Sequence, residues 1–290
     1  MAQNFNPRHN AKNSESHEYE EADSTLTQSS SHELAFLDKE FLLRNELRPV
    51  RIQLEILKPE LIFQDNAILS TLVVFGSSRI TDEKSARKNL EQAEKDFDSD
   101  PNNPKTSQRL QQAKKDLENS KYYYEAWKLG KIVSSNNPDK TMVITTGGGP
   151  GIMEAANKGA YDANSDSVGL NIVLPHEQYP NKYITPELCF QFHYFATRKM
   201  HFLFRTKGLV VFPGGFGTMD EMFEALTLIQ TQKIRPFPII LFGKQFWNNI
   251  INFQGLVEEG TISEKDLELF HFVETAEDAW EIISTYNNYK

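Results

Sequence analysis

Short and almost continuous apolar runs alternate with longer amphipathic segments from residue 70 onward. The runs lie at residues 70–75, 141–146, 168–175, 208–212 and 237–243, and a last brief run lies at 271–274. Strands that are buried on both faces of a parallel sheet carry such runs, and parallel strands need a crossover connection that is usually a helix. The pattern therefore predicts an α/β fold, a doubly wound parallel sheet with helices on both faces.

The chain before the first strand is predicted to be an appendage. Residues 1 to about 30 are polar, rich in Ser and Glu and almost free of large aliphatic side chains, which predicts a disordered tail over 1–30. Apolar residues at helical spacing follow, which predicts an amphipathic helix that Pro49 ends. The segment 50–68 fits either a strand or a helix, and its Pro59 argues against one long element. We assign residues 31–69 as a helical packing arm.

A charged segment at about 83–125 interrupts the domain predicted for residues 70–290. It is rich in good helix formers and is broken by the sequence DSDPNNP, which predicts a helical hairpin. Such a charge run is usually a solvated face. The aromatic residues 122–124 and Trp127 indicate that one side of it packs.

Composition restricts the class of protein. A chain of 290 residues with a formal net charge of −9 lacks the basic surface that nucleic-acid binding requires, so no nucleic-acid partner is expected. Its one cysteine, Cys189, excludes an internal disulfide and a cysteine-based zinc site, and no clustered-histidine motif occurs, so no metal is expected. No signal peptide and no membrane-spanning run is present, and we expect a cytoplasmic protein without membrane contacts.

Three polar turns follow predicted strands: GSSR at 76–79, GGGPG at 147–151 and PGGFGT at 213–218. Glycines allow the backbone amides to approach a ligand, and the N-terminus of the following helix favours an anion. Because ligands of such sheets bind at the carboxyl ends of the strands, the three turns predict a site for a phosphorylated ligand. The first turn also fits a tight turn with an exposed arginine. The candidate ligand-binding residues are Gly76, Ser77 and Arg79 in the first turn, Gly147, Gly148, Gly149 and Gly151 in the second, and Gly214, Gly215, Gly217 and Thr218 in the third.

Two common phosphate-binding motifs are absent. The dinucleotide fingerprint needs GxGxxG after the first strand, where this chain has GSSR, so NAD is not expected. A P-loop needs Lys-Ser or Lys-Thr after the glycines, and neither cluster has it. No cofactor is therefore expected.

Three segments together carry a resemblance to a known family: GGGPGIMEAANKGA, ATRKM at residues 196–200, and PGGFGTMDE. They resemble the signature of the LOG family, the cytokinin-activating phosphoribohydrolases that are often labelled lysine decarboxylases. The resemblance implies a Rossmann-like fold and hydrolysis of the N-glycosidic bond of a nucleoside 5′-monophosphate to a free base and ribose 5-phosphate. It also implies a homodimer or an assembly of dimers. By position, Arg198 and Glu221 match the family's catalytic pair, and the glycines with Thr218 match its phosphate cradle.

The chemistry of Glu221 also follows from general principles, although two roles remain open. Cleavage of a C1′–N bond passes through an oxocarbenium-like state, and a carboxylate close to C1′ can stabilise the developing cation, act as a nucleophile or activate water. The alternative role is structural: Thr218 and Glu221 have the spacing of a capping box at a helix start.

The residues around this pair have alternative roles as well. Arg198 stays protonated, so we expect it to bind phosphate or ribose or to orient Glu221, and its alternative is a surface ion pair. Lys199 is a further candidate ligand-binding residue, although nothing resembles a pyridoxal-phosphate site. A base could stack on Met153 or on the nearby aromatics Phe192, Tyr194 and Phe195, although such residues more often belong to a core.

Two hypotheses follow for the function. The first is an enzyme, an N-glycosidase acting on AMP, on cytokinin riboside monophosphates, or on both. The second is a non-catalytic carrier of a nucleotide or of a phosphorylated cofactor, because similar folds can bind such ligands without turnover.

Overall fold

The computed structural model describes residues 28–137, 142–174 and 179–288. Of the predicted tail, residues 1–30, only residues 28–30 lie within these ranges. The chain forms two compact units, Met1–Gln53 and Leu54–Lys290.

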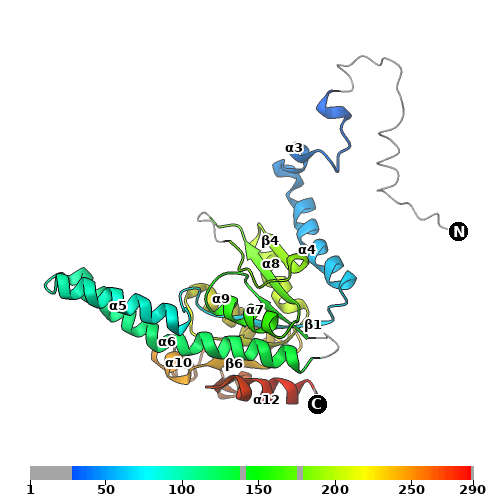
Figure 1. Ribbon diagram of the computed structural model, residues 1–290. Helices are drawn as coiled ribbons and strands as arrows, with labels where there is room; N and C mark the ends of the chain where they lie inside the picture. The colour runs from blue at the N-terminus through cyan, green and yellow to red at the C-terminus, as the bar shows by residue number, and fades with distance from the viewer. Residues whose placement is uncertain (1–27, 138–141, 175–178, 289–290) are drawn as a thin grey trace. The chain divides into compact units, whose positions relative to one another are not determined.

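The second unit contains a seven-stranded parallel sheet in the order β4-β3-β2-β1-β5-β6-β7 (Figure 1). From β1 the chain builds β2, β3 and β4 outward on one side, and then returns to place β5 on the other side of β1. The direction of winding therefore reverses between β1 and β5. The strands are β1 (Ser70–Phe75), β2 (Met142–Thr146), β3 (Ser167–Ile172), β4 (Cys189–Phe192), β5 (Thr206–Val211), β6 (Ile239–Phe242) and β7 (Phe270–Val273).

Apolar side chains cover both faces of the sheet, as the continuous runs predict. Along β1, Val73 and Phe75 join one buried cluster, while Leu72 and Val74 join the other, because successive strand side chains point to opposite faces. The first cluster includes residues of α4, α8, α9, α10 and α11, and the second includes residues of α6, α7 and α12. The predicted doubly wound α/β fold is confirmed.

α-Helices connect the successive strands, except that the described residues between β3 and β4 form only a short 3-10 helix. The helices of the chain are α3 (Lys39–Leu42), α4 (Arg48–Asp65), α5 (Glu83–Ser99), α6 (Pro104–Ser135), α7 (Ile152–Asp162), α8 (Phe195–Phe204), α9 (Phe216–Gln230), α10 (Lys244–Ile250), α11 (Phe253–Glu258) and α12 (Ala276–Tyr286). Short 3-10 helices occupy Ser30–His32, Asn45–Leu47, Pro186–Leu188 and Glu264–Leu269.

The predicted effects of Pro49 and Pro59 on the segment before β1 were wrong, and so was the extent of the helix predicted from His32. Pro49 does not end a helix; it is the second residue of α4. Proline is tolerated there because an N–H in the first turn has no intrahelical acceptor. Pro59 does not divide the segment either, because α4 continues through it. The helix expected from His32 is reduced to the four residues of α3 and short 3-10 turns.

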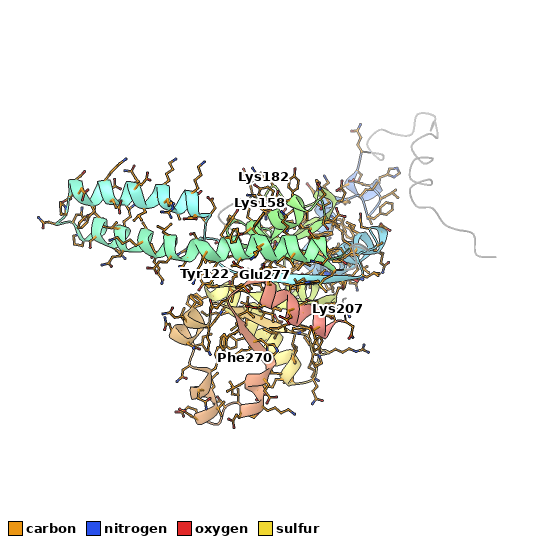
Figure 2. The ribbon with its side chains drawn as sticks, turned by 60° about the horizontal axis from the view of Figure 1, so that its bottom comes forward. Tyr122, Lys158, Lys182, Lys207, Phe270 and Glu277 are labelled. Atoms are coloured by element: carbon orange, nitrogen blue, oxygen red, sulfur yellow. The ribbon has the colours of Figure 1, made fainter. Side chains whose placement is uncertain are left out.

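The charged hairpin after β1 consists of α5 and α6, separated by residues 100–103. Helix α6 continues without a break to Ser135, and its Ala126, Leu129 and Val133 are fully buried against the sheet. The hairpin is therefore an extension of a crossover helix of the sheet. On the same face α6 packs beside α12, where Lys128 pairs with Glu277 at 2.7 Å (Figure 2).

Strand β4 was missing from the sequence prediction. It has only four residues, at the edge of the sheet, and its polar Gln191 interrupts the apolar pattern. Its pairing with β3, rather than its own composition, makes it a strand.

Candidate active site

A pocket of about 620 Å³ lies beside the ends of β1 and β5, where the winding of the sheet reverses. This is the position at which doubly wound sheets bind ligands, and the volume suits a nucleotide-sized molecule. All three polar turns contribute to it. The lining residues are Phe75, Gly76, Ser77, Ser78, Arg79, Gly147, Met153, Phe195, Arg198, Gly215, Phe216, Gly217, Thr218, Met219, Asp220 and Glu221.

The turn after β5 presents the start of α9 to the pocket. The helix begins at Phe216, with Gly215 as its N-cap, and no side chain caps it. The first amides of α9 therefore lack intrahelical acceptors and can bind an anion. Thr218 is not the cap, as the sequence suggested, but the third residue of the helix. Gly214 does not line the pocket; a Cβ there would lie 2.2 Å from Thr218 Oγ1, so it allows the turn to close on Thr218.

The turn after β1 lies against the turn after β5. The N–H of Ser77 donates to the C=O of Pro213 at 3.0 Å, and the N–H of Phe212 donates to the C=O of Phe75 at 2.8 Å. Arg79, which is exposed, brings a cation to the edge of the pocket. The two turns thus form one wall that offers amides, hydroxyls and a positive charge.

The turn after β2 contributes less to the pocket than the sequence predicted. Of its glycines only Gly147 lines the pocket, while Gly148, Gly149 and Gly151 do not. Gly148 and Gly151 have positive φ angles of 77° and 72°, and Gly151 is the N-cap of α7. Pro150 precedes that cap rather than lying in the first turn of the helix. These three glycines shape the loop, and a direct contact with ligand does not follow from their positions.

Arg198 projects from α8 into the pocket, with its guanidinium held by backbone carbonyls. Its Nε donates to the C=O of Leu170 at 2.7 Å, and its Nη2 lies 3.4 Å from the C=O of Gly147. Burial lowers the pKa of Arg198, and the nearby Glu221 raises it, but a guanidinium stays charged at neutral pH. The alternative of a surface ion pair is wrong, because these hydrogen bonds fix the cation at the pocket.

Glu221 lies in the second turn of α9, and only 8% of it is exposed. Burial raises its pKa from the ordinary 4.5 to about 7, although the cations Arg198 and Lys199 oppose the shift. The capping-box interpretation is wrong, because α9 begins at Phe216 and places Glu221 beyond its first turn. The carboxyl group accepts no hydrogen bond from any residue that the structure describes. A buried carboxyl group with a perturbed pKa in a pocket is a candidate for catalysis.

Lys199 is not among the residues that line the pocket, although a contact with ligand was expected. Its Nζ lies 2.8 Å from Asp220 Oδ1 and 3.2 Å from Glu224 Oε2, so these two carboxylates neutralise it. This pair of contacts joins α8 to α9, the helices that carry Arg198 and Glu221.

The proposed base-stacking residues divide into two groups. Met153 and Phe195 line the pocket, whereas Phe192 is buried in the core and Tyr194 is the N-cap of α8. Phe216, which was not among the predicted site residues, lines the pocket and is 92% exposed. Its place between Gly215 and Gly217 could have identified it, because a residue inside a ligand-binding turn must lie beside the ligand.

Among the described residues, no group of three or more His, Cys, Asp or Glu side chains is arranged to hold a metal ion. No helix in the described part of the chain is long and apolar enough to cross a membrane.

Comparison with known proteins identifies relatives of the predicted kind. The family model described as "Possible lysine decarboxylase" matches residues 153–283. Cytokinin riboside 5′-monophosphate phosphoribohydrolase LOG3 of Arabidopsis thaliana is 26% identical over 172 residues, which are 58% of this chain and 76% of that protein. LOG1 of the same plant is 27% identical over 173 residues, with the same coverage. The resemblance to the LOG family is confirmed.

Solved structures with a similar fold include the molybdenum cofactor carrier protein from Chlamydomonas reinhardtii. It is 17% identical and covers 76% of this chain and 98% of its own, with a TM-score of 0.43. The molybdenum cofactor binding protein from Rippkaea orientalis is 19% identical and covers 57% of this chain and 86% of its own, with a TM-score of 0.41.

Proposed function

We propose that this protein hydrolyses the N-glycosidic bond of nucleoside 5′-monophosphates, AMP or cytokinin riboside monophosphates or both, to a free base and ribose 5-phosphate. The observation that carries the proposal is the buried Glu221, with its pKa of about 7, in the same pocket as Arg198 and the uncapped start of α9. The similarity to plant phosphoribohydrolases supports the same reaction class.

The 5′-phosphate is expected to bind at the start of α9 and the turn after β1. Gly215, Gly217 and Thr218 offer amides there, and a Cβ at Gly215 or Gly217 would meet no atom within 4 Å, so the backbone is open to a ligand. Ser77 and Arg79 face the same region of the pocket. The helix start, the hydroxyl group and the guanidinium all favour a dianion.

The ribose would then extend along α9 toward Glu221, which lies one turn beyond Thr218. As the C1′–N bond breaks, its electron pair leaves with the base and positive charge develops on the sugar. An ionised Glu221 stabilises that charge and accepts the proton of the water that attacks C1′. The leaving base takes a proton from solvent, and ribose 5-phosphate is released.

Arg198 is expected to bind the sugar or phosphate and to hold Glu221 in its ionised state. Its guanidinium is fixed by the C=O groups of Leu170 and Gly147, so it does not need to reorganise during the reaction. Its charge also opposes the burial that raises the pKa of Glu221.

The remaining assignments rest on the resemblance. We propose a cytoplasmic homodimer or assembly of dimers, with residues 70–290 as the catalytic domain, 83–125 as an inserted hairpin and 31–69 as a packing arm. Exposed apolar side chains on α8 and α9 support a protein interface near the pocket, because such surfaces are uncommon on monomers. They include Phe195, Met200, Phe204 and Phe223.

The test is to incubate the purified protein with a panel of nucleoside 5′-monophosphates, including AMP and N6-substituted forms, and to separate the products by chromatography. The proposal predicts release of free base from at least one of them. Tight binding of a nucleotide without any base release would instead favour the carrier hypothesis.

A further inference from the structure

Helix α8 carries Arg198, but it has no cap of its own. It begins at Phe195, and its N-cap residue Tyr194 makes no side-chain hydrogen bond to the first turn. The first amides of a helix need acceptors from elsewhere. The local sequence His193, Tyr194 and Phe195 contains none of the short polar side chains that usually provide them.

Glu55 in α4, about 140 residues earlier in the chain, instead binds the backbone that leads into the helix. Its carboxylate accepts the N–H of His193 at 2.8 Å and the N–H of Tyr194 at 3.3 Å. It also lies 2.7 Å from the hydroxyl of Thr197, which can donate to it. A half-buried negative charge thus lies at the positive end of α8, where it stabilises the helix.

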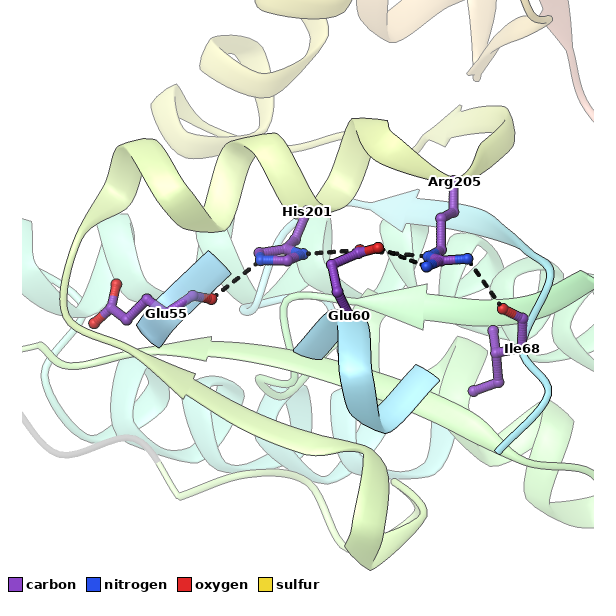
Figure 3. A network of polar contacts seen from close by, with 5 residues as sticks. All are labelled: Glu55, Glu60, Ile68, His201 and Arg205. Atoms are coloured by element: carbon purple, nitrogen blue, oxygen red, sulfur yellow. Dashed lines mark hydrogen bonds and ion pairs between the residues drawn. The ribbon is translucent and has the colours of Figure 1, made fainter. Parts of the chain in front are cut away.

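The backbone of Glu55 contacts α8 as well. Pro59 has no N–H, so the C=O of Glu55 has no intrahelical donor at that position. His201, on the next turn of α8, places its Nε2 3.1 Å from this oxygen (Figure 3). Glu55 therefore contacts both the start and the middle of the helix.

A second contact between α4 and α8 lies farther along both helices. Glu60 pairs with Arg205, the residue that ends α8, at 2.5 Å, and Figure 3 shows this pair beyond His201. Glu60 Oε1 also lies 3.6 Å from His201 Nδ1, so Glu60 contacts the middle and the far end of α8 but not the backbone at its start.

We infer that Glu55 is a positioning residue for Arg198, and this inference rests on the proposed site. Thr197, whose hydroxyl meets the Glu55 carboxylate, directly precedes Arg198 in the first turns of α8. The N–H of Arg198 bonds to the C=O of Tyr194 at 3.3 Å, so the position of Tyr194, which Glu55 holds, sets where the guanidinium enters the pocket. Glu55 thus supports the site, although it lies outside the segment that the family model matches.

The test compares Glu55→Gln with the matched control Glu60→Gln, which weakens the other contact between α4 and α8. Glu55→Gln removes the negative charge and one of the two acceptor oxygens at the start of α8. The loss should be comparable to that of a helix cap, roughly five- to tenfold in an equilibrium, so AMP binding, kcat/KM or both should weaken by about that factor. Glu60→Gln should lower the melting temperature about as much as Glu55→Gln does. It should leave AMP binding and kcat/KM within about twofold of wild type. Equal losses in the two variants would overturn the inference.

A double-mutant cycle identifies the route of the effect. If Glu55 acts through Arg198, adding Glu55→Gln to Arg198→Ala should cause little further loss, whereas independent effects would multiply. Multiplying effects would refute a positioning role. If Glu55→Gln folds poorly, Thr197→Val, which removes only one donor to the carboxylate, should show the same coupling at smaller size.

The cycle also separates this inference from the proposed reaction. Dissociation constants for AMP and for ribose 5-phosphate are measured by calorimetry in all variants, alongside base release. If wild type binds AMP but releases no base, the proposed hydrolysis fails, while coupling in the binding constants still supports Glu55. If base is released but Glu55→Gln behaves as wild type, only the positioning role fails.

Discussion

Replacing Glu221 by Gln should make the protein more stable, and more so as the pH rises. The buried carboxyl group has its pKa raised from 4.5 to about 7, so the folded state holds this proton more tightly than the unfolded state. Below about pH 4.5 both states are protonated, and the group has no effect on unfolding. Between about pH 4.5 and 7 the unfolded chain releases the proton first, and stability falls with rising pH.

The shift gives the size of this loss. At about 1.4 kcal/mol per pKa unit, the ionised Glu221 costs the folded state roughly 3 kcal/mol above pH 7. Glutamine resembles the protonated form and has no such cost. Because 1 kcal/mol shifts the melting temperature of a domain of this size by about 2–4 °C, the variant should melt roughly 6–12 °C above wild type at about pH 8. The attraction of Arg198 is already included in the shift.

The assay is thermal unfolding, followed by circular dichroism, of both proteins between about pH 4.5 and pH 8.5, the range in which the linkage operates. The difference in melting temperature should be near zero at the acid end and should grow up to neutral pH. Glu224→Gln is the matched control, because it removes a carboxyl group from the next turn of α9, outside the pocket lining. If the difference in melting temperature between Glu221→Gln and wild type does not change with pH, the claim that burial raises the pKa of Glu221 is refuted.

Further predictions concern the ligand and the turns. AMP should be hydrolysed and adenosine hardly at all, because the proposed site at the start of α9 binds the 5′-phosphate that adenosine lacks; comparable rates on the two would contradict the proposed phosphate site. Arg198→Ala should weaken AMP binding as well as turnover if the guanidinium contacts ligand, and turnover alone if it only orients Glu221, which calorimetry and steady-state kinetics distinguish. Gly148→Ala should destabilise the protein by about 1–3 kcal/mol in denaturant unfolding, because φ is 77° and the new Cβ would lie 2.2 Å from Asn171 Oδ1. Gly217→Ala, whose Cβ meets no protein atom, should stay within about 0.5 kcal/mol of wild type but weaken AMP binding.

The sheet and the location of the pocket could be predicted from the sequence, because local signals determine both. Continuous apolar runs identify strands buried on both faces, and the carboxyl ends of parallel strands lie on one edge of the sheet. The three polar turns therefore had to lie on that edge. The edge strand β4 was missed because it is held by pairing with β3, which no local signal reports.

The roles of individual residues could not be predicted from their spacing in the sequence, because they depend on where helices begin and on which residues pack nearby. Thr218 and Glu221 have the spacing of a capping box, and only the start of α9 at Phe216 excludes that role. Pro59 is usually a helix breaker, but here His201 satisfies the carbonyl that it leaves free. Lys199 looked like a ligand contact, yet Asp220 and Glu224 already neutralise it. Each of these outcomes depends on a partner that tertiary packing supplies.

Base release from AMP by wild type and by Glu221→Gln, measured side by side at about pH 8 where Glu221 is ionised, tests the central claim most directly. The account predicts equimolar adenine and ribose 5-phosphate from wild type. Losing the group that stabilises the developing charge or activates water should lower turnover by about a hundredfold or more, while AMP binding persists. Unchanged turnover by a folded Glu221→Gln protein would contradict the catalytic role of Glu221, and binding of AMP by wild type without any release of base would contradict the enzyme itself.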